Sequence, residues 1–109
     1  MPRARAMLLI LLVLTACAAG AEPLRPAKKN VSIKDMQFQP AAIEVQAGDT
    51  VTWTNNDDRD HTVTADDGSF KSDNISTGGK FVYKFTKAGK FSYACSYHPR
   101  MKGTVTVTD

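Results

Sequence analysis

The sequence predicts an all-β fold, a sandwich of seven to eight short strands. From residue 30 onward, apolar and polar side chains alternate in short runs, which is the pattern of half-buried strands. Turn sequences rich in Gly, Asp and Pro separate these runs at intervals of about 8–12 residues, a spacing typical of sandwiches. The apolar residues of this region do not recur with the period of a helix over any useful length. A chain of 109 residues has room for one such domain.

The domain opens with an imperfect alternation. Val31, Ile33, Met36 and Phe38 follow the strand period with a slip of one residue at Asp35, where we expect a β-bulge. Further strands are expected at residues 42–46, 50–55 and 61–64, after a proline break at 40, a turn at 47–49 and a polar loop at 56–60.

The second half continues the same pattern. Asp66-Asp67-Gly68 predicts a turn, and Phe70 starts the next short stretch. Strands are expected at residues 81–85, 91–95 and 104–108, bounded by loops at 76–79 and 88–90. We assign the large aromatic side chains of these strands to the core of the sandwich: Trp53, Phe81, Phe85, Phe91 and Tyr93.

The N-terminus has the pattern of an export signal. Arg3 and Arg5 form a basic segment, and residues 7–14 are an unbroken apolar run of eight. This run is far shorter than the roughly 20 residues that a membrane-spanning helix needs, so it predicts the hydrophobic region of a signal peptide. We therefore expect residues 1–16 to be a signal peptide that directs bacterial export to the periplasm.

The sequence that follows resembles the lipobox of bacterial lipoproteins, Leu14-Thr15-Ala16-Cys17. The resemblance implies that Cys17 is acylated, becomes the first mature residue and attaches the protein to a membrane. Ordinary cleavage after Ala19-Gly20-Ala21 is the alternative. Residues 17–29 have the composition of a linker, and as a flexible coil they span about 20 Å. The folded domain is expected at 30–109.

The charge of the mature chain is nearly balanced. Removal of residues 1–16 takes away Arg3 and Arg5, leaves 12 basic and 11 acidic residues, and lowers the formal net charge from +3 to +1. Such a chain shows no excess of basic residues for binding nucleic acid. We expect a monomer.

One segment near the C-terminus carries the chemistry. Cys95, His98 and Met101 lie three residues apart, so one short loop can bend a thiolate, an imidazole and a thioether around one ion. His61 is the only other histidine. Together these side chains are the ligands of a type 1 (blue) copper site, and methionine suits copper better than zinc. If Cys17 is acylated or removed, Cys95 has no disulfide partner in an oxidising compartment, and a metal would occupy its thiol.

Each ligand also has an ordinary structural interpretation. Taken alone, Cys95 is a small core residue, His61 a histidine with ordinary hydrogen bonds, and Met101 core filler. Their joint spacing favours copper. The charged loop 57–60 is either solvated or orients a partner, and Tyr97 and Pro99 are candidates for an apolar rim around His98.

The pattern as a whole resembles the cupredoxins, of the plastocyanin and amicyanin type. The matching segments cover nearly all of residues 31–109: Phe38-x-Pro40, Ile43-x-Val45-x-x-Gly48-Asp49-Thr50-Val51-x-Trp53-x-Asn55, His61, and Cys95-x-x-His98-x-x-Met101. The resemblance implies an eight-stranded Greek-key sandwich that binds one copper ion at one end, through His61, Cys95, His98 and Met101.

Two positions next to the ligands depart from relatives. Thr62 stands where many cupredoxins have an Asn that ties the two ligand loops together, and its hydroxyl can make only some of those bonds. Tyr97 stands where amicyanin has Pro, so a backbone N–H returns close to the thiolate. Both departures bear on the reduction potential.

The predicted function is the transfer of single electrons by a copper ion that cycles between Cu(I) and Cu(II). The expected partners are redox proteins, either a cytochrome c-like protein or a periplasmic oxidoreductase. We do not expect an enzyme, because cupredoxin-containing oxidases and nitrite reductases need more imidazoles than two. Copper storage or delivery is the alternative; it predicts clusters of Met and His, whereas the mature chain has only Met36 and Met101.

Overall fold

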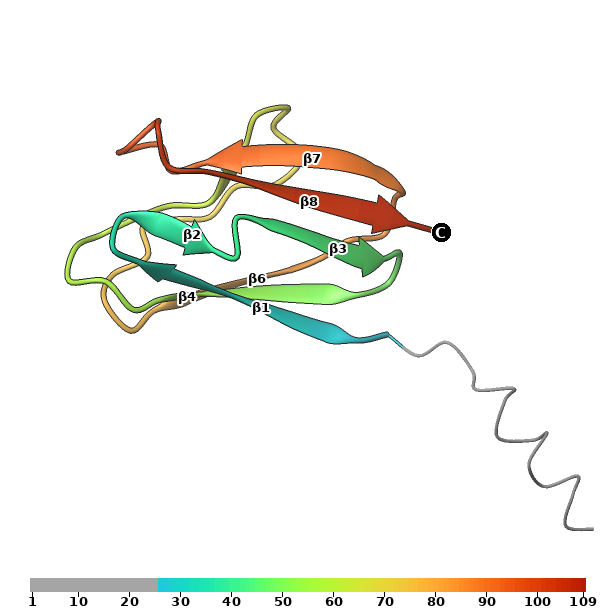
Figure 1. The fold of residues 1–109 in the computed structure, drawn as a ribbon, viewed down its shortest axis with the longest axis horizontal. Helices are drawn as coiled ribbons and strands as arrows, with labels where there is room; N and C mark the ends of the chain where they lie inside the picture. The colour runs from blue at the N-terminus through green and yellow to red at the C-terminus, as the bar shows by residue number, and fades with distance from the viewer. Residues whose placement is uncertain (1–25) are drawn as a thin grey trace, which may run out of the picture.

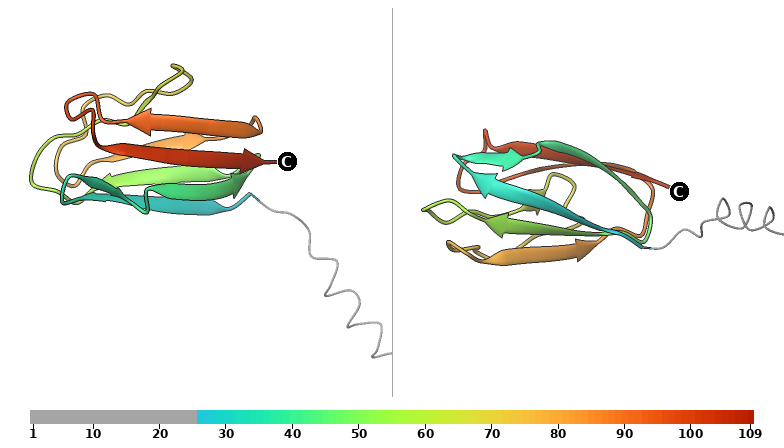
Figure 2. Two further views of the ribbon diagram at one scale, coloured as in Figure 1. Left: turned by 45° about the horizontal axis from the view of Figure 1, so that its top comes forward. Right: turned by 60° about the horizontal axis from the view of Figure 1, so that its bottom comes forward.

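Eight strands form two four-stranded sheets that pack face to face (Figure 1, Figure 2). The computed structural model describes residues 26–109. The predicted signal peptide (1–16), the acylation site Cys17 and most of the predicted linker lie outside the described residues. No helix long and apolar enough to cross a membrane occurs within residues 26–109.

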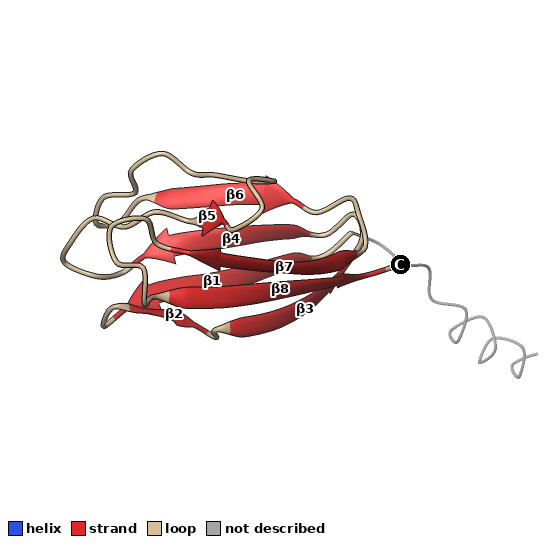
Figure 3. Cartoon of the chain, turned by 90° about the horizontal axis from the view of Figure 1, so that it is seen from above, coloured by secondary structure: helices blue, strands red, loops and turns tan. Residues whose placement is uncertain are grey.

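The two sheets combine strands that are distant in sequence (Figure 3). The first sheet has the order β2-β1-β4-β6, with bounds Gln37–Gln39, Lys28–Lys34, Thr50–Asn55 and Lys80–Lys84. The second has the order β3-β8-β7-β5, with bounds Ala42–Gln46, Lys102–Thr108, Gly89–Ala94 and Thr64–Ala65. β1 pairs with β4 and β3 with β8 in parallel, and the other pairs are antiparallel. The predicted Greek-key β-sandwich is confirmed.

Several predicted boundaries were wrong. The expected β-bulge at Asp35 is a two-residue turn: Asp35 and Met36 have φ of 52° and 59°, and Lys34 pairs with Gln37 across it. Positive φ at both central residues is the conformation that matches the twist of a tight hairpin. β1 begins at Lys28, two residues before the expected start of the domain.

The strand expected at residues 61–64 is shorter than predicted and lies at the edge of the second sheet. Only Thr64 and Ala65 form β5, whereas His61 makes an isolated bridge to Ile75 and Thr64 one to Lys71. The backbone of this segment pairs with the loop before β6 on one side, while Thr64 and Ala65 pair with β7 on the other. The short stretch expected from Phe70 is part of the same bridged loop.

Aromatic side chains fill the space between the sheets. Trp53, Phe85 and Tyr93 are buried as predicted, while Phe81 and Phe91 are only partly buried and pack against the core. Trp53 lies at the centre, with ring centroids 5.5 Å from both Phe81 and Tyr93. These aromatic contacts join β4 and β6 of the first sheet to β7 of the second.

One carboxylate joins the beginning of the domain to the turn after β3. Asp49 is buried, and its side chain accepts hydrogen bonds of 2.8 Å from the backbone N–H groups of Ala27 and Gln46. Both bonds stabilise the charged carboxylate, and the bond from Gln46 has the larger effect. They hold the pKa of Asp49 below its usual value of 3.8.

Acid should therefore weaken the domain through Asp49. A carboxyl whose pKa is lower in the folded state stabilises the fold above its unfolded pKa, and this contribution is lost as the pH falls through the folded value. We expect Asp49→Asn to lower the unfolding free energy by about 1–2 kcal/mol at pH 7. The loss should shrink below about pH 4, which urea unfolding at both pH values would measure. An equal loss at pH 7 and pH 3 would contradict this role.

Candidate metal centre

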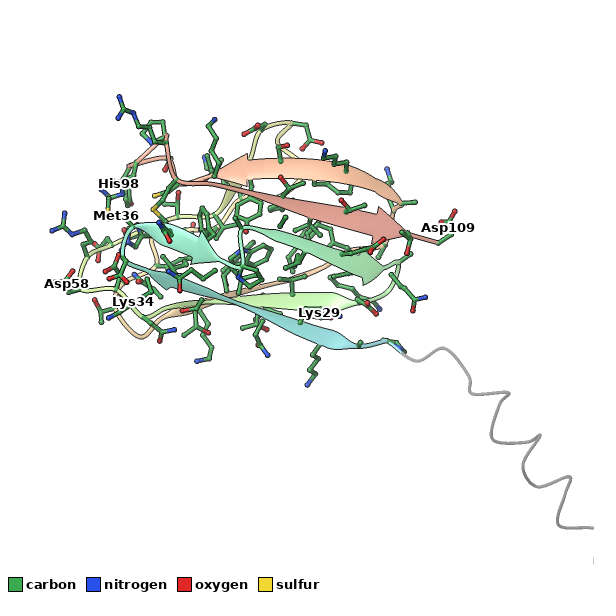
Figure 4. All side chains as sticks on the ribbon, viewed as in Figure 1. Lys29, Lys34, Met36, Asp58, His98 and Asp109 are labelled. Atoms are coloured by element: carbon green, nitrogen blue, oxygen red, sulfur yellow. The ribbon has the colours of Figure 1, made fainter. Side chains whose placement is uncertain are left out.

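The predicted ligands meet at one end of the sandwich. Figure 4 shows His98 at this end, together with Met36 and Asp58, while Asp109 lies at the opposite end. Cys95 directly follows β7, and the loop from Ser96 to Met101 leads into β8. His61 follows the loop after β4, which belongs to the other sheet. The site thus joins the two sheets.

Three donor atoms converge at this end of the sandwich. The Sγ of Cys95 lies 3.8 Å from Nδ1 of His61 and 3.6 Å from Nδ1 of His98. One ligand atom from each of these three side chains lies within 4.8 Å of the other two. Cys95 and His61 are fully buried, whereas His98 is half-buried. His98 is therefore the ligand whose ring edge reaches the surface.

Backbone hydrogen bonds close the loop that carries three of the ligands. The N–H of Cys95 donates to the carbonyl of Met101 at 3.1 Å, and the N–H of Met101 donates to the carbonyl of His98 at 2.9 Å. The N–H of His98 donates to the carbonyl of Cys95 at 3.3 Å. Met101 is buried, with 4% of its surface exposed. The spacing of three residues between the ligands matches this closed turn.

A carboxylate that the sequence interpretation assigned to a solvated loop faces His61. The Nε2 of His61 lies 2.9 Å from Oδ2 of Asp57, which also accepts a hydrogen bond of 3.0 Å from the N–H of Met36. A carboxylate only accepts, so Nε2 carries the proton and Nδ1 keeps its lone pair for a metal. The bond from His61, with that from Met36, lowers the pKa of Asp57 to about 2.

A buried asparagine fixes the loop that holds this carboxylate. Asn55 is fully buried; its Nδ2 donates to the carbonyls of Arg59 and Ile75, and its Oδ1 accepts from the N–H of Asp57. The sequence identifies neither Asn55 nor Asp57 as part of the site, because a run of charged residues before a histidine is more often solvated. Of that run, Asp58 and Arg59 do face solvent, with side chains 89% and 61% exposed.

Thr62 ties the two ligand loops together. Its backbone N–H donates to Sγ of Cys95 at 3.3 Å, and its hydroxyl oxygen accepts from the N–H of Ser96 at 2.8 Å. The same hydroxyl lies 2.9 Å from the hydroxyl of Ser96. Thr62 therefore supplies, through its backbone as well as its side chain, the connection that the resemblance assigns to an asparagine at this position.

Tyr97 does not bond the sulfur as its backbone N–H suggested. Within residues 26–109, the backbone N–H that donates to Sγ of Cys95 is that of Thr62. The hydroxyl of Tyr97 instead donates to Oδ1 of Asn74 at 2.7 Å, and half of the residue is exposed. The substitution of Tyr for Pro thus places a polar and aromatic side chain beside His98 without a new bond to the thiolate.

The donor set fits copper. A thiolate, two imidazole nitrogens and a thioether are the ligands of a type 1 copper site, and a carboxylate that orients one histidine is a typical partner of such ligands. The buried thiol of Cys95 is the only free cysteine of the described residues.

Comparison with known proteins leads to the same family. A family model described as a cupredoxin-like domain matches residues 5–107. This chain belongs to the cupredoxin family. It is 34% identical over 101 residues to amicyanin-alpha of Methylorubrum extorquens, and the alignment covers 84% of this chain and 85% of that protein. It is 34% identical over 83 residues to plastocyanin of Scenedesmus fuscus, which covers 64% of this chain and 85% of that one.

A solved structure shares the fold as well as the sequence pattern. The purple cupredoxin from Nitrosopumilus maritimus superposes with a TM-score of 0.69 at 31% identity, over 73% of this chain and 99% of that chain. Cupredoxins bind one copper ion, and in this cupredoxin His61, Cys95 and His98, with Met101, form a type 1 site.

The carboxylate beside His61 should govern the copper affinity of this cupredoxin. Asp57→Ala leaves Nε2 of His61 and the N–H of Met36 without their acceptor, so we expect copper affinity to fall about 10–100-fold. Competition with a chromogenic chelator measures this. Asp57→Asn keeps an acceptor oxygen and should recover part of the loss.

The neighbouring carboxylate provides the matched control. Asp58 is exposed and lies beside Asp57 in the loop, so Asp58→Ala removes the same charge without touching His61. We expect its copper affinity to change less than about twofold. Equal losses in Asp57→Ala and Asp58→Ala would show that charge alone acts at this end of the molecule.

Proposed function

We propose that this cupredoxin carries single electrons between redox proteins of the bacterial periplasm. The proposal rests on the cluster of donors at one end of the sandwich, in which one ligand atom each from His61, Cys95 and His98 lies within 4.8 Å of the other two. Copper bound there supplies a one-electron couple between Cu(I) and Cu(II). The chain's contribution is to hold four donors in one arrangement, so that neither oxidation state requires the loops to move.

The half-buried ligand is the proposed route for the electron. His61 is enclosed and held by Asp57, whereas His98 lies on the outer loop with Tyr97 exposed beside it. Their ring centroids are 5.1 Å apart. A redox partner that docks over His98 reaches the site through one imidazole ring. We propose a cytochrome c-like protein or a periplasmic oxidoreductase as that partner.

Export and attachment form a separate part of the proposal. Residues 1–16 act as the signal peptide, and Cys17 is the residue that carries the lipid. One acyl chain binds membranes only marginally, so stable attachment needs the multiple chains of a lipoprotein. Cys17→Ala should release the protein from the membrane fraction. Mass spectrometry that finds an unmodified N-terminus at Glu22 would contradict attachment at Cys17.

Electron transfer and copper delivery predict different fates for the metal. A carrier exchanges electrons with a soluble c-type cytochrome, measured by stopped-flow absorbance, and keeps its copper through repeated cycles. A delivery protein loses copper to an acceptor when reduced. Of the two methionines of the described residues, Met36 is 36% exposed and Met101 is buried, so this part of the chain presents one exposed methionine. Transfer of copper to an apo-acceptor within a few reduction cycles would overturn the carrier function in favour of delivery.

A further inference from the structure

The outer face of the first sheet carries charge of one sign. Residues that pair across β1, β4 and β6 share a face, and the row furthest from the metal end reads Lys28, Thr50 and Lys84. The row of Ser32 and Thr54 ends at Lys80 on β6, and Lys34 follows at the end of β1. All four lysines are exposed. We name this surface, defined by Lys28, Lys34, Lys80 and Lys84, the lysine face.

No carboxylate lies among the strand positions of the lysine face. Between the lysines the outward residues of β1, β2, β4 and β6 are polar, with one exposed valine: Asn30, Ser32, Gln37, Gln39, Thr50, Thr52, Thr54 and Val82. Within residues 26–109 the ion pairs are Arg59–Asp58 and His61–Asp57, so none of these lysines is paired. The lysine face therefore presents positive charge without internal compensation.

The second sheet shows that this is not a general property of the sandwich. Its central row across β3, β8 and β7 reads Glu44, Thr106 and Lys90, one acid and one base. The two-layer arrangement leaves both outer faces free of other strands (Figure 2). The two outer faces are alike in construction and differ in charge.

We propose that the lysine face binds the anionic headgroups of a membrane. Four unpaired lysines on a polar sheet complement a layer of negative phosphates, and each basic residue near such a surface adds to binding. β1 begins at Lys28, and ten residues separate Lys28 from Cys17 in the sequence. Ten residues reach at most about 36 Å even when fully extended, so a lipid on Cys17 would keep the lysine face within that distance of the bilayer.

The extent of the lysine face favours a membrane over an acidic redox protein. The face runs along the whole side of the sandwich, from the start of β1 at the end remote from the loop that carries His98 (Figure 1) to Lys34, which lies at the metal end with Met36 and Asp58 (Figure 4). A redox partner must reach His98, whereas a bilayer needs only the side of the sheet. The choice of a membrane as the partner of the lysine face rests on the proposed attachment at Cys17.

Rates of lysine acetylation on vesicles test the proposal with an internal control. The natively processed protein is mixed with vesicles of phosphatidylcholine, with or without phosphatidylglycerol, and acetylation is followed residue by residue by mass spectrometry. We expect the four lysines of the lysine face to react about fivefold more slowly on anionic vesicles. Lys90 and Lys102, which lie on the second sheet, should change less than twofold. Salt at about 0.5 M should remove the protection.

Paired variants separate the lysine face from overall charge. In the Cys17→Ala background, the double substitution Lys80→Gln with Lys84→Gln should reduce partition onto anionic vesicles more than tenfold. Lys90→Gln with Lys102→Gln removes the same charge and should reduce it less than twofold. In the natively processed protein used for the acetylation experiment, the mass of the N-terminal peptide reports whether Cys17 is acylated, so failed attachment is distinguished from a failed lysine face.

Three results would overturn the proposal. Equal protection of both sheets would show that the lysine face has no special role. Equal protection on neutral and anionic vesicles would show that its charge is not recognised. Protection by an acidic polypeptide but not by anionic vesicles would identify an acidic protein as the occupant instead.

Discussion

Cys95→Ser is expected to abolish the blue colour of the copper-loaded protein. An alcohol cannot replace the soft, anionic sulfur that gives a type 1 site its intense absorption, and two imidazoles with a thioether do not restore it. Cys95 is fully buried at the end of β7, and serine is of similar size, so the sandwich should remain folded. The cost of the buried hydroxyl should be about 1–2 kcal/mol. Visible absorption after addition of Cu(II), with far-ultraviolet circular dichroism, measures both effects.

The other cysteine of the sequence is the control. Cys17→Ser changes a residue that is not part of the site, so the colour should keep its full intensity. If Cys95→Ser stayed as blue as the unchanged protein, the thiolate would not be a ligand and the site would be wrongly assigned.

Gly103→Ala should cause the largest loss of stability. Gly103 pairs with Tyr93 across β7 and β8, and a Cβ at Gly103 would lie 2.2 Å from Cζ of the Tyr93 ring. Tyr93 is 1% exposed and has Phe38 at 4.7 Å and Trp53 at 5.5 Å between ring centroids, so the ring has no space to move. We expect a loss of about 3 kcal/mol, which lowers the melting temperature by roughly 12–24 °C.

A double-mutant cycle isolates this contact. In a Tyr93→Leu background the ring is absent, and Gly103→Ala should cost less than about 1 kcal/mol. Tyr93 lies two residues before Cys95 on β7, so the single variant should also weaken copper binding. The same cost of Gly103→Ala in both backgrounds would mean that the backbone of β8, and not the tyrosine ring, makes glycine necessary.

The four ligands could be predicted from the sequence because three of them are regularly spaced and the chain has only two histidines. Three ligands lie in one short loop, and the fourth is the sole remaining histidine. The partners of those ligands were not accessible. Asp57 contacts His61 in a loop that Asn55 holds through bonds to Arg59, Ile75 and Asp57, a conformation that no local pattern specifies.

The fold could also be predicted in part. The alternation of apolar residues predicted the strands of the sandwich, while the turn at Asp35 and Met36 was mistaken for a bulge. Both interpretations explain a slip of one residue, and only the positive φ at both positions distinguishes them. The tyrosine at position 97 suggested a bond to the thiolate, but Thr62 on the neighbouring loop provides it.

Titration of the metal-free protein with Cu(II) tests the central claim most directly. Visible absorption should rise in proportion to added copper, reach its end point at one copper per chain, and disappear on mild reduction while the copper stays bound. A protein that binds one copper per chain and remains colourless would contradict the assignment of His61, Cys95, His98 and Met101 as a type 1 site.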